Sequence, residues 1–98
     1  MNEKRLRSLM GFCTRAGQGI FGEEGCRKAL QSGKAGLLLL DETISEGSAG
    51  KLERLCGHSG VRVCRLPEGF LEEATGRTGK AMAVPAGNFS EEMIRCLE

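Results

Sequence analysis

The most informative stretch of the chain is Gly36-Leu37-Leu38-Leu39-Leu40, which is followed at once by Asp41-Glu42-Thr43. A continuous apolar run bounded in this way is typical of a strand that is covered on both faces. Such a strand needs helices on each side of its sheet, so the run predicts a helix–sheet–helix arrangement. The four leucines are far too few to span a bilayer, and we expect no membrane segment.

One helix and a very short strand are predicted at the N-terminal end. Apolar residues recur at helical spacing over about residues 3–16. They are Leu6, Leu9, Met10 and Cys13. Gly17 can cap this helix, because glycine adopts the left-handed backbone conformation without strain. Ile20-Phe21 is long enough only for a very short strand.

A second helix is predicted between this segment and the leucine run. Gly22 opens it, and Glu23 and Glu24 occupy its first turn, where carboxylates complement the positive end of the helix dipole. Gly33 ends it. Its inner face consists of Cys26, Ala29 and Leu30.

Helices and strands also alternate after the leucine run. Ser45 is a suitable N-cap for a third helix, which Gly57 and Gly60 end. A strand is predicted at 61–66, where Pro67 stops it, and a helix at about 68–75. A further strand is predicted at 81–84, where Pro85 stops it. Ser90 is predicted to cap a last helix, with Phe89 and Ile94 as a hydrophobic staple. The alternation predicts an α/β fold, an α-β-α sandwich in one domain covering residues 1–98.

The composition is that of an ordinary folded domain. Of the 98 residues, 40% are hydrophobic and 28% charged, so disorder is not expected. The five cysteines are Cys13, Cys26, Cys56, Cys64 and Cys96. Their odd number and wide spacing fit neither a disulfide framework nor a zinc site, so we interpret them as small buried hydrophobic residues. No apolar segment follows the basic N-terminal residues, which favours the cytoplasm.

Charge is unevenly distributed along the chain. The net charge is +1, but residues 1–40 hold seven Lys or Arg against three Glu, whereas residues 41–98 hold seven against ten Asp or Glu. This asymmetry, +4 against −3, suggests that one surface faces an anionic partner.

The segment Gly17-Gln18-Gly19-Ile20-Phe21-Gly22 matches the dinucleotide-binding pattern G-x-G-x-x-G, with Asp41 and Glu42 about 20 residues further on. That pattern works only after a buried strand, which brings the pyrophosphate to a helix N-terminus. Here an amphipathic helix comes first. A small phosphate- or nucleotide-binding protein therefore stays as an alternative only.

The start of the second helix remains a candidate binding site. Its first amides are free to face a phosphate or a base edge. Arg15, Arg27 and Lys28 lie nearby in the sequence, with Lys34 at the far end. Such cations supply the phosphate contacts that position a nucleic acid.

These segments resemble the kink-turn-binding ribosomal protein family of archaea and eukaryotes, and most of all the bacterial YlxQ-like proteins. The resemblance covers nearly the whole chain and is most specific from the R-A-G motif to the G-K-A motif. The segments that carry it are Arg15-Ala16-Gly17, Gly22-Glu23-Glu24, Lys28-Ala29, Ser32-Gly33-Lys34-Ala35, the Leu37 to Leu40 strand, Glu42, and Leu71, Ala74 and Gly76.

The resemblance implies a three-layer α-β-α sandwich with a four-stranded mixed sheet. It also implies RNA contacts from the start of the second helix and from the loop after the third main strand. Carried over, these are Gly22, Glu23, Glu24, Lys28, Arg65, Leu66 and Pro67. Lys28 would contact the RNA backbone, Leu66 and Pro67 would offer apolar surface to an unstacked nucleotide, and Glu42 would orient the site or contact RNA.

The chain departs from the family pattern at several positions. Glu24-Gly25 stands where the family has an Asn-Glu pair that reads sheared G·A pairs, and a glutamate cannot donate a hydrogen bond as asparagine does. Gln18 replaces a commonly basic residue, and Glu72 replaces a glycine. These departures favour, as an alternative, a protein-interaction module on the same fold that has lost RNA affinity.

The function expected from the sequence is thus that of a cytoplasmic, ribosome-associated, RNA-binding protein without catalytic activity or a cofactor. Structured, kink-turn-like RNA is the expected partner, with ribosomal proteins as further partners, and the chain is expected to be a monomer. The expected RNA-binding set also includes Arg15, Gln18 and Arg27.

Overall fold

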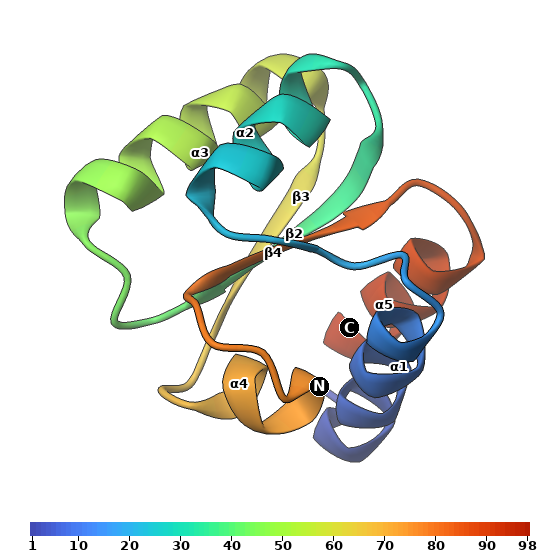
Figure 1. Cartoon of the computed structure of the whole chain (residues 1–98). Helices are drawn as coiled ribbons and strands as arrows, with labels where there is room; N and C mark the ends of the chain where they lie inside the picture. Colours follow the sequence, from blue (N-terminus) through green and yellow to red (C-terminus); the bar gives the residue numbers. More distant parts are fainter.

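The leucine run lies near the middle of a four-stranded mixed sheet (Figure 1). The computed structural model describes all 98 residues. Its elements are α1 (Glu3–Arg15), β1 (Ile20–Phe21), α2 (Glu23–Gln31), β2 (Ala35–Asp41), α3 (Glu46–Ser59), β3 (Arg62–Leu66), α4 (Phe70–Thr75), β4 (Ala81–Pro85) and α5 (Asn88–Leu97). The strand order is β1-β4-β2-β3, with β2 parallel to β3 and antiparallel to β4.

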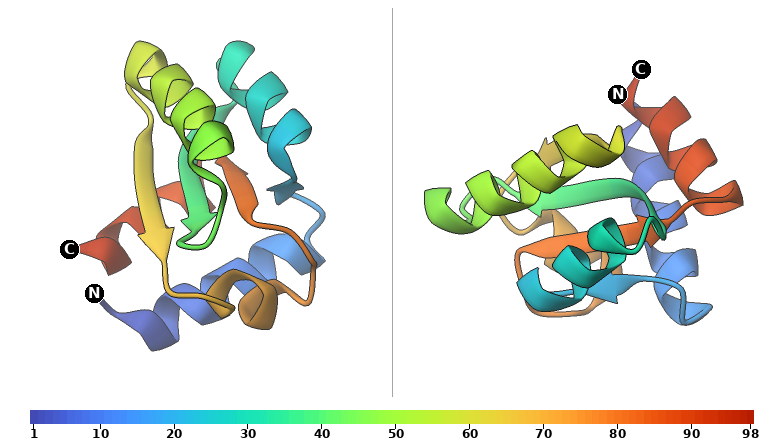
Figure 2. Two further views of the ribbon diagram at one scale, coloured as in Figure 1. Left: turned by 90° about the vertical axis from the view of Figure 1, so that its left-hand side faces the viewer. Right: turned by 90° about the horizontal axis from the view of Figure 1, so that it is seen from above.

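Helices cover both faces of this sheet (Figure 2). Successive residues of a strand point to opposite faces, so β2 supplies two cores. Leu37 and Leu39 pack with α1, α4 and α5, whereas Leu38 and Leu40 pack with α2 and α3. All four leucines are fully buried. The predicted α-β-α sandwich with a four-stranded mixed sheet is confirmed.

Glycines end the first two helices as the sequence predicts. Gly17 has φ +72°, and its amide donates to the Thr14 carbonyl at 3.0 Å while the Gln18 amide donates to the Cys13 carbonyl at 3.1 Å. These two bonds are the Schellman arrangement, which satisfies carbonyls that the helix end leaves free. Gly33, with φ +77°, closes α2. The end of α3 lies at Gly60 alone, because Gly57 is still helical.

The start of α5 differs from the prediction. The helix is capped at Gly87, so Ser90 is not the N-cap but lies in the first turn, where its hydroxyl accepts a hydrogen bond from the Gly87 amide at 3.0 Å. The predicted staple between Phe89 and Ile94 is therefore wrong. The physical reason lies in β2: a Cβ on Gly36 would come within 2.7 Å of Ser90 Oγ, so α5 begins directly against the strand.

The two ends of the chain lie side by side at one corner of the molecule (Figure 2). The Asn2 amide donates to the Cys96 carbonyl at 2.7 Å. No helix has the length and apolar content needed to cross a membrane.

Candidate nucleic-acid interface

Four chain connections meet at one end of the sheet. β1, β2 and β3 all end there and β4 begins there, because β4 runs antiparallel to both β1 and β2 while β3 runs parallel to β2. The connections are Gly22, residues 42–45, residues 67–69 and residues 76–80. The topology thus places Gly22, Glu23 and Glu24 at the same end as Glu42 and Pro67.

The start of α2 is open at this end of the sheet. Gly22 has φ +86° and ψ 158°, and its amide is fixed by a 3.1 Å hydrogen bond to the Ala81 carbonyl. It has no side chain to cap the helix. The first amides of α2 therefore have no side-chain acceptor, and they carry the positive end of the helix dipole.

A groove of about 520 Å³ lies beside this helix start. Gly22 and Glu23 form one wall, and the loop after β2 with the first turn of α3 forms another. The residues that line it are Gly22, Glu23, Thr43, Ile44, Ser45, Ser48, Gly79, Lys80 and Ala81. The lining offers several hydroxyls and one ammonium group, which can donate to phosphate or base oxygens.

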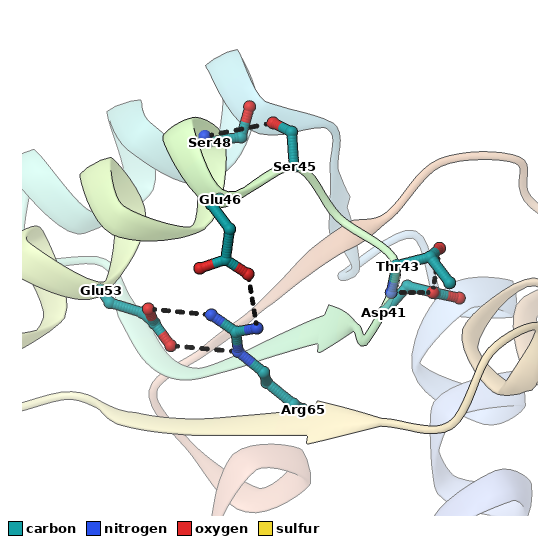
Figure 3. Close-up of polar contacts among 7 residues, drawn as sticks. All are labelled: Asp41, Thr43, Ser45, Glu46, Ser48, Glu53 and Arg65. Carbon is teal, nitrogen blue, oxygen red and sulfur yellow. Dashed lines mark hydrogen bonds and ion pairs between the residues drawn. The ribbon is translucent and has the colours of Figure 1, made fainter.

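Asp41 joins the loop after β2, which borders the groove, to the loop after β3; Figure 3 shows its contacts with Thr43. It is 4% exposed, and its Oδ1 accepts bonds from the Thr43 amide (2.8 Å) and hydroxyl (2.6 Å) while Oδ2 accepts from the Gly69 amide (3.0 Å). Burial opposes the ionisation of Asp41. The hydrogen bonds from Thr43 and Gly69 and the nearby charge of Lys80 outweigh that effect, and together they lower the pKa of the carboxyl group. Asp41 therefore positions the loops as a carboxylate.

The charged residues of α2 differ in their availability. Glu24 forms an ion pair with Arg27, which also donates to the Gln31 side chain at 2.8 Å. The hydrogen bond from Arg27 lowers the pKa of Glu24. Lys28 is exposed and has no ion pair. It lies in the last turn of α2 and lines a second hollow together with Lys34, so it is not part of the groove at the helix start.

The loop after β3 only partly matches the prediction. Leu66 is fully buried, so the expectation that it offers apolar surface to a nucleotide is wrong. It pairs in register with Asp41, and strand alternation turns its side chain into the core with α1, α4 and α5. Pro67 is exposed, and Glu42 Oε1 accepts a 3.2 Å hydrogen bond from the Glu68 amide.

Arg65 is already held by carboxylates (Figure 3). Its guanidinium contacts Glu53 at 3.2 Å and Glu46 at 3.5 Å, both on α3. These contacts raise the pKa of Arg65, with the hydrogen bond to Glu53 as the main cause. Arg65 therefore serves first to join β3 to α3.

Arg15 and Gln18 lie at the end of α1, in the helix layer on the other side of the sheet from α2. Both are exposed, and the Arg15 guanidinium lies 4.9 Å from the centre of the Phe12 ring. The topology does not bring them into the groove, whose lining includes neither residue.

The glycines of the Gly17 to Gly22 run have structural roles. Gly17 ends α1 and Gly22 begins α2. A Cβ on Gly19 would lie 2.9 Å from the Phe21 ring, so Gly19 lets this ring pack closely against the backbone. The run also follows a helix, whereas a dinucleotide-binding turn follows a strand. No group of three or more His, Cys, Asp or Glu residues is placed to hold a metal.

Several residues of this region were not found by the sequence reasoning. Thr43, Ser48 and Lys80 line the groove, and the Arg77 guanidinium lies 4.5 Å from the centre of the Phe21 ring. The available signal was the polar segment Gly76-Arg77-Thr78-Gly79-Lys80 directly before a buried strand. Only the antiparallel direction of β4 brings this segment to the start of α2.

Fold and site together define a small α/β protein with an open, polar end of its sheet. No protein-family model and no curated protein matches the chain. Among solved structures, it is similar to a protein with unknown function from Bacillus halodurans C. The two are 27% identical, with a TM-score of 0.88, and the match covers 95% of this chain and 96% of the other.

Proposed function

We propose that this protein binds structured, kink-turn-like RNA in the cytoplasm, in association with the ribosome and without catalysing a reaction. The observation that carries the proposal is the uncapped start of α2, on a helix whose last turn presents the exposed, unpaired Lys28. This site lies at the sheet end where the loops after β2 and β3 also lie. The proposal also draws on the resemblance of the sequence to the kink-turn-binding family.

Each part of the site has a suitable role in such binding. The free amides of α2 donate to phosphate or base oxygens, and Lys28 contributes a phosphate contact. Glu23 is exposed and without an ion pair, so its carboxylate can accept from a base amino group. Pro67 supplies the apolar contact for an unstacked nucleotide in place of the buried Leu66.

The direct test is a fluorescence-anisotropy titration with a labelled kink-turn RNA and a straight duplex of matched length, each at low and moderate salt. We expect preferential binding to the kinked RNA. Lys28→Ala should weaken it roughly tenfold, the size of one charge-assisted contact, and should lower the salt slope by about one. Lys4→Ala is the matched control, because Lys4 is exposed, unpaired and on α1 in the opposite layer. Equal weak binding to both RNAs, unaffected by Lys28→Ala, would refute the proposal.

A second candidate function is docking to another protein. The same end of the sheet also holds four exposed carboxylates, on Glu23, Glu42, Glu46 and Glu68. These oppose phosphate and suit a basic protein surface instead. This candidate predicts no RNA binding even at low salt, together with salt-sensitive association with a basic ribosomal protein.

A further inference from the structure

We propose that the RNA-binding surface extends from the start of α2 around the β1 edge of the sheet to α1, through two guanidinium–phenylalanine pairs. These pairs are Arg77 with Phe21 and Arg15 with Phe12. The inference rests on the proposed function and adds a contact region for the stem that flanks the kink.

The first pair lies at the end of the edge strand β1, on the face of the sheet that α1, α4 and α5 cover. Phe21 is the last residue of β1 and precedes Gly22, and β1 is an edge strand of the sheet. Arg77 is exposed and stacks over the Phe21 ring at 4.5 Å, and its side chain makes no hydrogen bond or ion pair. Phe21 packs against the core formed with α1, α4 and α5, so a free guanidinium is held on that face of the sheet, at the edge strand that leads into α2.

The second pair continues this surface on α1. Phe12 is 53% exposed and is, with Met1, one of the two exposed large hydrophobic residues. Arg15 stacks over its ring at 4.9 Å. A Cβ on Gly11 would lie 3.4 Å from Arg15 Nη1 and 3.3 Å from the Ala74 carbonyl, so the Arg15 side chain and the last turn of α4 both lie close to Gly11. Arg77 follows that turn by two residues, so both pairs border the same end of α4.

Both guanidiniums are suited to phosphate. Stacking occupies the face of the guanidinium and leaves its in-plane N–H groups free for phosphate oxygens. Arg5 and Arg7, also on α1, instead form ion pairs with Glu92 and Glu73. Of the arginines on α1, only Arg15 is left without a carboxylate, and it lies at the end nearest Arg77. The exposed Phe12 ring adds a surface on which an unpaired base can stack.

The test uses two kink-turn RNAs, one trimmed to the kink and one with both stems extended. The variants are Arg15→Gln/Arg77→Gln, Lys28→Ala and a control with the same loss of charge, Arg54→Gln/Arg62→Gln. The control residues are exposed and unpaired, and they lie on α3 and at the opposite end of β3. Circular dichroism checks that each variant is folded.

We expect the Arg15→Gln/Arg77→Gln variant to bind the extended RNA at least tenfold more weakly, with a salt slope lower by about two, because two phosphate contacts are lost. Binding to the trimmed RNA should remain as in the wild type, and Lys28→Ala should weaken both. Wild-type affinity of the double variant for the extended RNA, with Lys28→Ala still weakening it, would overturn the extension and leave the proposed function standing. If the wild type binds neither RNA, both fail.

Discussion

Replacement of Gly36 by alanine should destabilise the fold, although alanine favours strands more than glycine does. A Cβ at this position would lie 2.6 Å from Ala86 Cα, 2.7 Å from Ser90 Oγ and 3.1 Å from the Ala86 nitrogen. Carbon atoms prefer separations of about 3.5–4.0 Å, so the start of α5 would have to move away from β2 by about 1 Å. Overpacking of this kind costs about 1–3 kcal/mol, and the gain from removing a strand glycine offsets about 0.5–1 kcal/mol.

The expected net loss is therefore up to about 2.5 kcal/mol, with a midpoint of about 1 kcal/mol, which lowers the Tm of a domain of this size by roughly 5–10 °C. Because the chain has no Trp or Tyr, far-ultraviolet circular dichroism is the suitable probe for urea and thermal unfolding. Adding Ser90→Ala should not restore stability, since the contact with the Ala86 backbone remains.

Gly50→Ala is the matched control for this experiment. Gly50 lies inside α3, and a Cβ there would meet nothing within 4 Å. This substitution should raise stability by up to about 1 kcal/mol, the difference in helix propensity. If Gly36→Ala proved as stable as the wild type, the start of α5 would not be packed so closely against β2 that a Cβ at position 36 destabilises the fold.

Two other predictions concern buried polar groups. Asp41→Asn should lower the free energy of unfolding by about 1–3 kcal/mol, because the side-chain amide would point an N–H donor at the backbone amide of Thr43 or Gly69. Since the pKa of Asp41 is lowered in the folded chain, its contribution is complete above about pH 4 and is lost as the pH falls through the folded value. Urea unfolding at pH 3 and pH 7 should therefore show a smaller difference for the variant than for the wild type. Burial raises the pKa of Cys26 to about 12 and that of Cys56 to about 11. A thiol reagent at pH 8 should therefore modify the half-buried Cys64 first, and should modify Cys26 and Cys56 only when the protein unfolds. Rapid modification of Cys26 in the folded protein would contradict the structure.

The element order and both cores followed from local patterns in the sequence. Leu37 to Leu40 predicted the central strand because four consecutive apolar residues need cover on both faces, and helices are what the chain offers on either side. The helix ends were also predictable, because the left-handed backbone of Gly17 and Gly33 and the capping side chain of Ser45 involve only neighbours in the sequence.

The errors lie where long-range packing overrides a local signal. Ser90 has the right chemistry for an N-cap, but the missing side chain at Gly36, more than 50 residues earlier, lets α5 start at Asn88. Leu66 follows Arg65 at a strand end that was expected to be open, yet its register opposite Asp41 turns it inward. The groove was missed for the same reason, since Lys80 reaches it only through the antiparallel pairing of β4.

Because the two chain ends lie next to each other, the order of the elements along the chain could be changed without changing their arrangement in space. Because the Asn2 amide is bonded to the Cys96 carbonyl, a few added residues could join the ends without moving α1 or α5. The chain could then be reopened at the exposed Gly60, so that it would begin with β3 and finish with α3. In such a circular permutant the crossover from β2 through α3 to β3 no longer exists as a covalent connection, and the parallel pair must form from the two extremities of the polypeptide.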